Sequence, residues 1–356
     1  MIDIRPPVKL DYLKALTDDT GIIQHTKYSI PNRSEGYTTD DNARALVACI
    51  KYLQVNDDKE VKKLANTYLS FLFHMQRPDG RFQNLLSYDR RFLDDAGSED
   101  CMGRSLWACG CATSTHLSEG IRTTSKEIFD RGFSHASNFE SLRAKAFAIL
   151  GLCSYYEAFP DDRNLARNIV LLTNQLTDYY RVEAYSEWCW FEPYLTYANS
   201  RLPQALFKAY RAVGHEKYVR IAKKSFDFLI ETQIIDGKFV PIGNKGWYKK
   251  GDERAFYDQQ PIEASCMVEA ALTAFYITDE EKYKRLAHLA FEWFLGKNTQ
   301  NVVVYDTVTG ACHDGITPEG LNLNQGAEAT ISYLLARLEL ENLGRRELFR
   351  RPKPNI

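Results

Sequence analysis

The chain contains 356 residues, of which 44% are hydrophobic and 26% are charged, and this balance is typical of a soluble globular protein. The formal net charge is only −2 and the sequence has no basic block, which excludes an electrostatic case for binding nucleic acid or an anionic membrane. No run approaches the roughly 18 apolar residues of a membrane span. Residues 1–7 lack the positive and apolar regions of a secretory signal, so we expect a cytoplasmic protein.

The eight cysteines are scattered and form no regular framework. Cys109 and Cys111 are separated by one residue, and the sequence has no second pair to match them. We therefore expect reduced thiols rather than disulfides or a zinc site. The HExxH, GxSxG and glycine-rich phosphate-loop motifs are also missing from the sequence, so we expect neither a metal ion nor another cofactor.

A cluster of polar residues opens the first long helix of the chain. The stretch TTDDNARAL covers residues 38–46 and leads into an apolar-periodic run that continues to about residue 54. A short oxygen-bearing side chain such as Thr39 can cap this helix, because it accepts a hydrogen bond from a free N–H in the first turn. Capping needs one such residue, whereas the stretch also carries Asp40, Asp41, Asn42 and Arg44.

The same design recurs along the chain. Helices of small and apolar residues begin at polar clusters and span about residues 40–54, 98–116, 137–156, 192–213, 258–276 and 322–338. Charged amphipathic helices follow the first five of these and span about residues 59–76, 124–133, 165–180, 217–232 and 282–295. Residues 1–35 form an N-terminal lead-in with one short helix at 8–16, and residues 343–356 form a C-terminal tail.

This alternation predicts stacked helical hairpins, with the small-residue helices inside and the charged helices facing solvent. An open solenoid is one arrangement of such hairpins, but it usually has a tight and uniform period. Here the loops before the polar clusters are long and variable, and they would all lie at one end of the assembly. We therefore predict an all-α fold, a closed (α/α)6 barrel formed by residues 1–356 as one domain, with short β-hairpins among the loops at one end.

Five motifs resemble the six-hairpin glycosidase-like superfamily, the (α/α)6 toroids. They are TTDDNARAL, SEDCMGRSLWACG, WFEPYLTYANSRLPQAL, DQQPIEA and NQGAEAT. More narrowly, they are similar to a group associated with carbohydrate-active gene clusters and with domains fused to glycosyltransferases. Members of that group often carry Asp-Asn-Ala-Arg in the fourth polar cluster, whereas this chain has Ala198-Asn199-Ser200-Arg201, so no carboxylate acts at position 198. The resemblance implies a cleft where the inner helices begin and, as in many members, hydrolysis, elimination, phosphorolysis or epimerisation of sugars.

Carboxylates at these helix starts are candidates for acid and base catalysis. Glycoside hydrolysis needs two carboxyl groups flanking the scissile bond, one protonated and one ionised. Carboxylates that crowd one cavity raise one another's pKa, which a general acid requires at neutral pH. We predict catalytic roles for Asp41, Asp100, Glu192 and Glu263. The alternative for each is a helix cap or a partner for a nearby arginine.

Other residues of the polar clusters are predicted to bind substrate. Three arginines, each about one turn into a helix, could hold a carboxylated sugar or a phosphate, although structural ion pairs would explain them equally well. Aromatic residues near the fourth cluster could stack on a sugar, with core packing as the alternative; Trp247 lies in a glycine- and lysine-rich loop and is better placed for a contact at the rim. The predicted binding residues are Asp40, Asn42, Arg44, Glu99, Arg104, Trp190, Tyr197, Asn199, Arg201, Gln259, Gln260, His313, Asn324 and Glu328.

The leading hypothesis is an inverting glycoside hydrolase that acts on a short oligosaccharide or small sugar. A sugar epimerase or isomerase is the first alternative, because His25 and His313 lie in loops near the predicted mouth and related toroids use histidines as acids and bases. A phosphorylase is another alternative. A non-catalytic sugar-binding module that works with a glycosyltransferase is a different class altogether.

Overall fold

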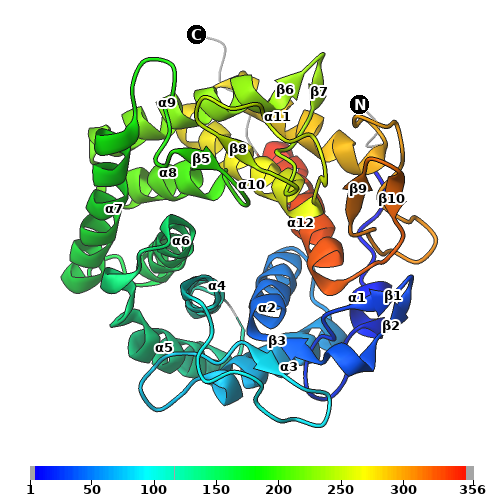
Figure 1. Cartoon of the computed structure of the whole chain (residues 1–356). Helices are drawn as coiled ribbons and strands as arrows, with labels where there is room; N and C mark the ends of the chain where they lie inside the picture. Colours follow the sequence, from blue (N-terminus) through cyan, green and yellow to red (C-terminus); the bar gives the residue numbers. More distant parts are fainter. Residues whose placement is uncertain (1–4, 116, 350–356) are drawn as a thin grey trace.

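The computed structural model describes residues 5–115 and 117–349, which form two concentric rings of helices (Figure 1). Each inner helix contacts the next one in chain order, and the last contacts the first, so the inner ring is closed. The inner ring consists of α2 (Thr39–Leu53), α4 (Glu99–Thr113), α6 (Leu142–Ala158), α8 (Arg201–Val213), α10 (Pro261–Thr278) and α12 (Ala327–Phe349).

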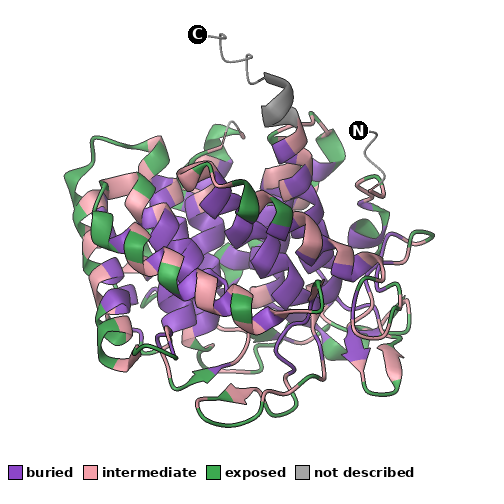
Figure 2. Ribbon diagram, turned by 90° about the horizontal axis from the view of Figure 1, so that it is seen from above, coloured by how far each residue is buried: buried purple, intermediate pink, exposed green. Residues whose placement is uncertain are grey.

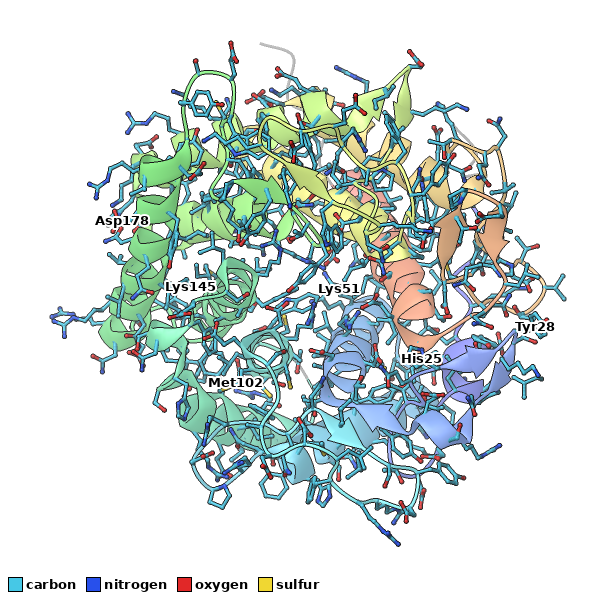
Figure 3. All side chains as sticks on the ribbon, in the orientation of Figure 1. His25, Tyr28, Lys51, Met102, Lys145 and Asp178 are labelled. Carbon is cyan, nitrogen blue, oxygen red and sulfur yellow. The ribbon has the colours of Figure 1, made fainter. Side chains whose placement is uncertain are left out.

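The outer helices are amphipathic, and each packs against the inner helix that precedes it. They are α3 (Lys59–Met75), α5 (Glu119–Phe133), α7 (Arg163–Glu183), α9 (Glu216–Gln233) and α11 (Glu281–Glu292). The short helix α1 (Asp11–Ala15) contacts α12. Asp178 lies on the outside of α7, whereas Lys51 of α2 points into the ring, where it pairs with Glu339 (Figure 3). Charge is therefore present on both sides of the inner ring.

The inner helices α4 and α6 approach each other closely because glycines lie at their contact. A Cβ atom on Gly110 would lie 2.1 Å from the carbonyl oxygen of Gly151, and one on Gly151 would lie 2.4 Å from the carbonyl oxygen of Leu106. A methyl group does not fit in either space. The side view of the barrel shows the result, a band of buried residues through the inner helices (Figure 2).

Short antiparallel strand pairs lie in the loops. Within the described residues they are β1 (Thr26–Lys27) with β2 (Ile30–Pro31), β3 (Tyr37–Thr38) with β4 (Leu85–Leu86), β5 (Tyr194–Leu195) with β8 (Tyr248–Lys249), β6 (Ile234–Ile235) with β7 (Lys238–Phe239), and β9 (Gly315–Thr317) with β10 (Gly320–Asn322). Three 3₁₀ turns accompany them, η1 (Arg33–Glu35), η2 (Ala136–Asn138) and η3 (Trp293–Leu295). These loops end where inner helices begin, so the strands gather at one end of the barrel, which we call the mouth.

The predicted closed toroid with long loops at one end is confirmed. Helix α5 begins at Glu119, five residues earlier than expected, because the side chain of Ser118 caps its first turn. Helix α12 continues to Phe349 and so includes half of the segment 343–356 that was expected to be a tail. Residues 350–356 and residue 116, the expected end of a helix, lie outside the described residues. Among the described helices, none is long and apolar enough to cross a membrane.

Candidate active site

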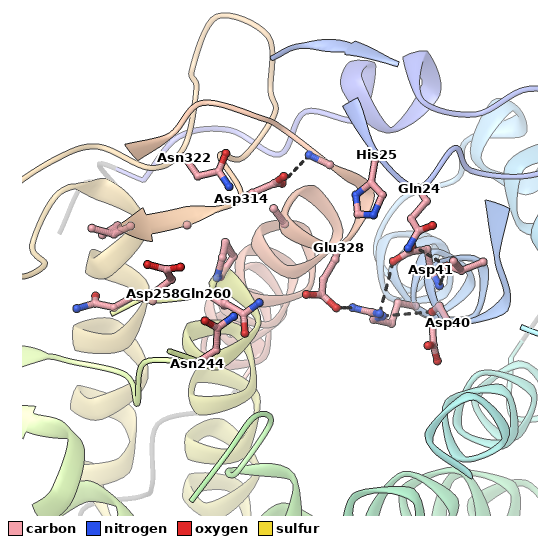
Figure 4. Close-up of a pocket in the computed structure, with 18 of the residues that line it drawn as sticks. Gln24, His25, Asp40, Asp41, Asn244, Asp258, Gln260, Asp314, Asn322 and Glu328 are labelled. Carbon is pink, nitrogen blue, oxygen red and sulfur yellow. Dashed lines mark hydrogen bonds and ion pairs between the residues drawn. The ribbon is translucent and has the colours of Figure 1, made fainter. Parts of the chain in front are cut away.

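A cavity of about 410 Å³ opens at the mouth, beside the first turns of α2, α10 and α12 (Figure 4). Its walls come from these turns and from the loops that precede them, including the lead-in segment and the β9–β10 hairpin. The polar residues that line it include Gln24, His25, Asp40, Asp41, Arg44, Asn244, Asp258, Gln260, Asp314, Asn322 and Glu328.

Asp41 is the predicted catalytic carboxylate that the structure places in the cavity wall. Thr38 caps α2 by accepting the backbone N–H of Asp41 (3.1 Å), and its hydroxyl donates to Asp41 Oδ2 (2.7 Å). The other oxygen, Oδ1, is buried and makes no hydrogen bond within the described residues, although Arg44 Nη2 lies 3.5 Å away. Burial raises the pKa of Asp41. The free oxygen and the raised pKa are properties of a carboxyl group that can hold a proton for donation.

Arg44 and Glu328 form an ion pair between α2 and α12 at the cavity. Arg44 also donates from Nε to the carbonyl oxygen of Asp40 (3.2 Å), so its guanidinium is fixed on two sides. Burial alone would raise the pKa of Glu328. The guanidinium of Arg44 outweighs this effect, so the pKa of Glu328 is lowered. Glu328 is therefore a stable anion beside Asp41.

Asp258 lies on the wall opposite Asp41, with the open cavity between them (Figure 4). It belongs to the segment that leads into α10, together with Gln260, which also lines the cavity. The backbone carbonyl of Asp258 accepts the N–H of Asn244 (2.9 Å), which brings a third polar side chain to this wall. Asp258 Oδ1 is buried and has no hydrogen-bond partner in the part of the chain that the structure describes.

The remaining wall is formed by residues from both ends of the chain. His25 of the lead-in is exposed and lines the cavity. Asp314 also lines it, and its Oδ1 accepts the N–H of Gly326 (2.7 Å). Burial raises the pKa of Asp314, and the positive charge of a protonated His25 would act in the opposite direction. The two segments are tied together by the N–H of Tyr28, which donates to Asn324 Oδ1 (2.9 Å).

The predicted residues on the α4–α6–α8 side of the mouth form a separate polar network and do not line the cavity. Asp100 accepts hydrogen bonds from Ser141 Oγ (2.7 Å) and the Tyr197 hydroxyl (2.8 Å), and it lies 3.4 Å from Arg104. Arg104 also pairs with Asp40 (3.0 Å), which lines the cavity, so Asp40 connects this network to the cavity.

Two further predicted carboxylates are held in structural contacts. Glu192 forms an ion pair with Arg143 (2.7 Å), whose guanidinium also donates to Asn199 Oδ1 (3.1 Å). Glu263 is buried and accepts the backbone N–H of Ala198, and burial raises its pKa to about 7. These two groups therefore do not line the cavity with Asp41, although we predicted catalytic roles for both from the sequence.

The arginines are paired with carboxylates rather than left open for an anionic ligand. Arg201 is buried, lies 2.5 Å from Glu269 and stacks over the ring of Trp107 at 4.7 Å. Arg44 and Arg104 have their carboxylate partners at the mouth. For all three arginines, the structure therefore favours ion pairs with carboxylates over binding of an anionic ligand.

Several predicted binding residues support the walls instead of lining the cavity with their side chains. Asn42 accepts the backbone N–H of Ile22 (3.1 Å) and so holds the lead-in against α2. Glu99 accepts two backbone N–H groups at the start of α6. The side chain of Gln259 accepts the indole N–H of Trp293 (2.9 Å), although its backbone borders the cavity.

Two more of the predicted binding residues, Trp190 and His313, lie away from the cavity surface. Trp190 is fully buried and packs edge-on against Phe191, so core packing explains it and a sugar cannot reach its ring. His313 does not line the cavity, and its Nδ1 is buried. Asp258 opens the fifth polar cluster and Asp314 precedes the sixth, but neither is among the predicted site residues.

No protein-family model and no curated protein sequence matches the chain, but solved structures do. A D-mannose isomerase has a TM-score of 0.70 at 14% identity, over 93% of this chain and 94% of that one. A cellobiose 2-epimerase from Bacillus thermoamylovorans has a TM-score of 0.74 at 12% identity, over 94% and 96%. An α-mannanase from Bacteroides thetaiotaomicron has a TM-score of 0.67 at 12% identity, over 95% of each chain. The chain therefore has the six-hairpin (α/α)6 toroid fold that these proteins share.

Proposed function

We propose that the protein is a carbohydrate-active enzyme, an inverting glycoside hydrolase that acts on a short oligosaccharide in the cavity at the mouth. The observation that carries this proposal is the position of Asp41 and Asp258 on opposite walls of that cavity (Figure 4). Glycoside hydrolysis with inversion needs one carboxyl group on each side of the scissile bond, with room for a water molecule beside one of them. A volume of about 410 Å³ between the walls leaves room for a sugar ring and that water.

Asp41 is assigned as the general acid. Because Thr38 donates its hydroxyl hydrogen to Oδ2, the proton of Asp41 resides on Oδ1, the oxygen that has no hydrogen bond within the described residues. Burial raises the pKa of Asp41, which favours the protonated form that a general acid requires. Glu328 and Arg44 stay paired beside it and offer fixed polar groups to the hydroxyls of the sugar.

Asp258 is assigned as the general base. Its side chain lines the cavity, and its carboxylate would accept a proton from a water molecule that attacks the anomeric carbon from the face opposite Asp41. Gln260 and Asn244 on the same wall provide amide groups that orient that water or the sugar ring. The structural neighbours include a D-mannose isomerase, a cellobiose 2-epimerase and an α-mannanase, which supports the choice of a sugar as substrate.

Epimerisation or isomerisation of a sugar is the second candidate function, and His25 favours it. An imidazole beside the carboxyl group of Asp314 in the same cavity could remove a proton next to a sugar carbonyl and return it to the other face. This reaction predicts that His25→Gln abolishes turnover, whereas the hydrolase predicts a smaller effect.

A product screen tests the assignment. Wild type, Asp41→Asn and Asp258→Asn are incubated with manno-, gluco- and galacto-oligosaccharides, with and without phosphate. The matched control is Asp161→Asn, because Asp161 is exposed between α6 and α7, away from the cavity. Wild type and control should release sugar, and each cavity variant should lose at least about 100-fold in rate. Equal rates in all four proteins would refute the roles of Asp41 and Asp258. Sugar binding without turnover by folded wild type would instead identify a binding module.

A further inference from the structure

Trp247 adopts a backbone conformation that is costly for a large side chain. Its φ is +59°, in the left-handed region that bulky residues rarely occupy. Two backbone hydrogen bonds hold it there: its N–H donates to the carbonyl of Gly243 (3.1 Å), and its own carbonyl accepts the N–H of Ala255 (2.8 Å). Such a conformation persists only when the surrounding structure imposes it, and it often serves to aim a side chain.

The loop that carries Trp247 is also a wall of the cavity. Asn244, three residues earlier, lines the cavity, and Asp258, the assigned base, lies at the end of the same loop. The N–H of Asn244 donates to the carbonyl of Asp258 (2.9 Å), which closes the loop at its base. Trp247 is therefore three residues from the cavity-lining Asn244 and directly precedes β8, which pairs with β5 before α8.

The ring of Trp247 lies beside a tyrosine that is rigidly held. The ring centroids of Trp247 and Tyr197 are 6.2 Å apart. Tyr197 donates its hydroxyl to Asp100 (2.8 Å), and the guanidinium of Arg143 lies 5.1 Å from its ring centroid. Trp247 remains partly exposed, and its indole N–H makes no hydrogen bond within the described residues. An exposed aromatic face with a free donor is a surface that can stack on a sugar ring and bond to its hydroxyls.

We propose that Trp247, backed by Tyr197, is the binding site for a second sugar unit. The substrate is then an oligosaccharide of at least two units, with one unit between Asp41 and Asp258 and the next unit stacked on Trp247. This inference rests on the proposed function, because it uses the same cavity for the first unit. Trp247 is then the part of the site that selects oligosaccharides over single sugars.

Titration calorimetry with wild type and three variants, each also carrying Asp258→Asn so that no probe is cleaved, tests the proposal without requiring turnover. The probes are the methyl glycosides, disaccharides and trisaccharides of mannose, glucose and galactose. Trp247→Asn removes the ring but tolerates the left-handed backbone, and Trp247→Phe keeps an aromatic ring. Tyr179→Asn is the control, because Tyr179 is 44% exposed on the outer helix α7.

Wild type and the control should bind a disaccharide about tenfold more tightly than the matching methyl glycoside. In Trp247→Asn this preference should disappear, and Trp247→Phe should restore part of it. An unchanged preference in Trp247→Asn would overturn the proposal, and so would a wild type with no preference. The hydrolase assignment is tested separately. A Trp247-dependent preference for disaccharides, without sugar release in the product screen, would support the stacking site and refute the catalytic roles of Asp41 and Asp258.

Discussion

Arg44 of α2 and Glu328 of α12 form an ion pair although 284 positions separate them in the chain. Because α2 is the first inner helix and α12 is the last, this pair lies at the seam where the ring closes. Lys51 and Glu339 form a second ion pair between the same two helices, further into the barrel. The seam therefore carries two ion pairs, and the pair of Arg44 and Glu328 is also part of the cavity wall.

Removing Arg44 should destabilise the protein more than removing the charge of Glu328. The Arg44 side chain is 7% exposed and faces both Asp41 and Glu328, so Arg44→Met removes a buried cation that both carboxyl groups face. We expect a loss of about 3 kcal/mol in the free energy of unfolding. Glu328 is 41% exposed, so Glu328→Gln should cost less than about 1 kcal/mol.

Urea unfolding measures both values, and Arg220→Met on the exposed face of α9 is the control, for which we expect no change. Equal losses in Arg44→Met and Glu328→Gln would contradict the assignment of Arg44 as the shared partner at the seam.

Glu263 should make stability depend on pH. Burial raises the pKa of Glu263 from 4.5 to about 7, so the folded state holds its proton more tightly than the unfolded state does. The resulting stability is fully present below pH 4.5 and is lost as the pH rises through about 7. At pH 8 the buried carboxylate should cost wild type about 3 kcal/mol relative to pH 4.

The measurement is the free energy of unfolding of wild type and Glu263→Gln across this pH range. The variant should lose the part of the decline that Glu263 contributes, whereas Glu231→Gln, at an exposed position of α9, should decline as wild type does. Parallel pH profiles for wild type and Glu263→Gln would show that this carboxyl group is not perturbed.

The contact between α4 and α6 should not tolerate a methyl group. Gly151→Ala places a Cβ atom 2.4 Å from the carbonyl oxygen of Leu106, so the helices must separate. We expect a loss of at least about 3 kcal/mol. Gly120→Ala on α5 meets nothing within 4 Å and should gain about 0.5–1 kcal/mol, because alanine favours the helix. Thermal unfolding of both variants checks the contrast; similar melting temperatures would contradict the close packing.

The cavity should reject anions. Its described lining carries five carboxyl groups, from Asp40, Asp41, Asp258, Asp314 and Glu328, and one guanidinium, that of Arg44, which is already paired. We therefore expect millimolar phosphate to leave the rate of sugar release unchanged, and oligosaccharides of uronic acids to remain uncleaved. Rates with and without phosphate test this directly. Phosphate-dependent release would instead support a phosphorylase.

The ring architecture could be predicted from sequence because its signals are local and repeated. Polar clusters such as the one at Asp40 and Asp41 mark the start of inner helices, and the charged helices between them mark the outside. Burial on the inner helices follows directly from this alternation. The end of α12 was harder to place, because the basic residues after position 344 resemble an exposed tail even though the helix continues through them to Phe349.

The composition of the cavity could be predicted only in part. Residues that begin inner helices, such as Asp41 and Glu328, line the cavity at the mouth, and their place at helix starts is visible in the sequence. Which of them share one cavity depends on how the loops fold over the mouth. Asp100 lies in the first turn of α4 and Glu192 lies in the loop before α8, but Ser141, Tyr197 and Arg143 hold them on the other side of the mouth. Those partners are 41 to 97 residues distant in sequence, and no local pattern reveals them.

A single proton NMR time course in D₂O, with an oligosaccharide that the product screen identifies, tests the central claim most directly. The account predicts that the signals of the glycosidic linkage disappear, that the first free sugar has the inverted anomeric configuration, and that Asp41→Asn and Asp258→Asn show neither change while Asp161→Asn matches wild type. An epimer or a ketose that forms while the glycosidic bond stays intact, with loss of activity in His25→Gln, would contradict the hydrolase assignment and establish proton transfer at the sugar carbon instead.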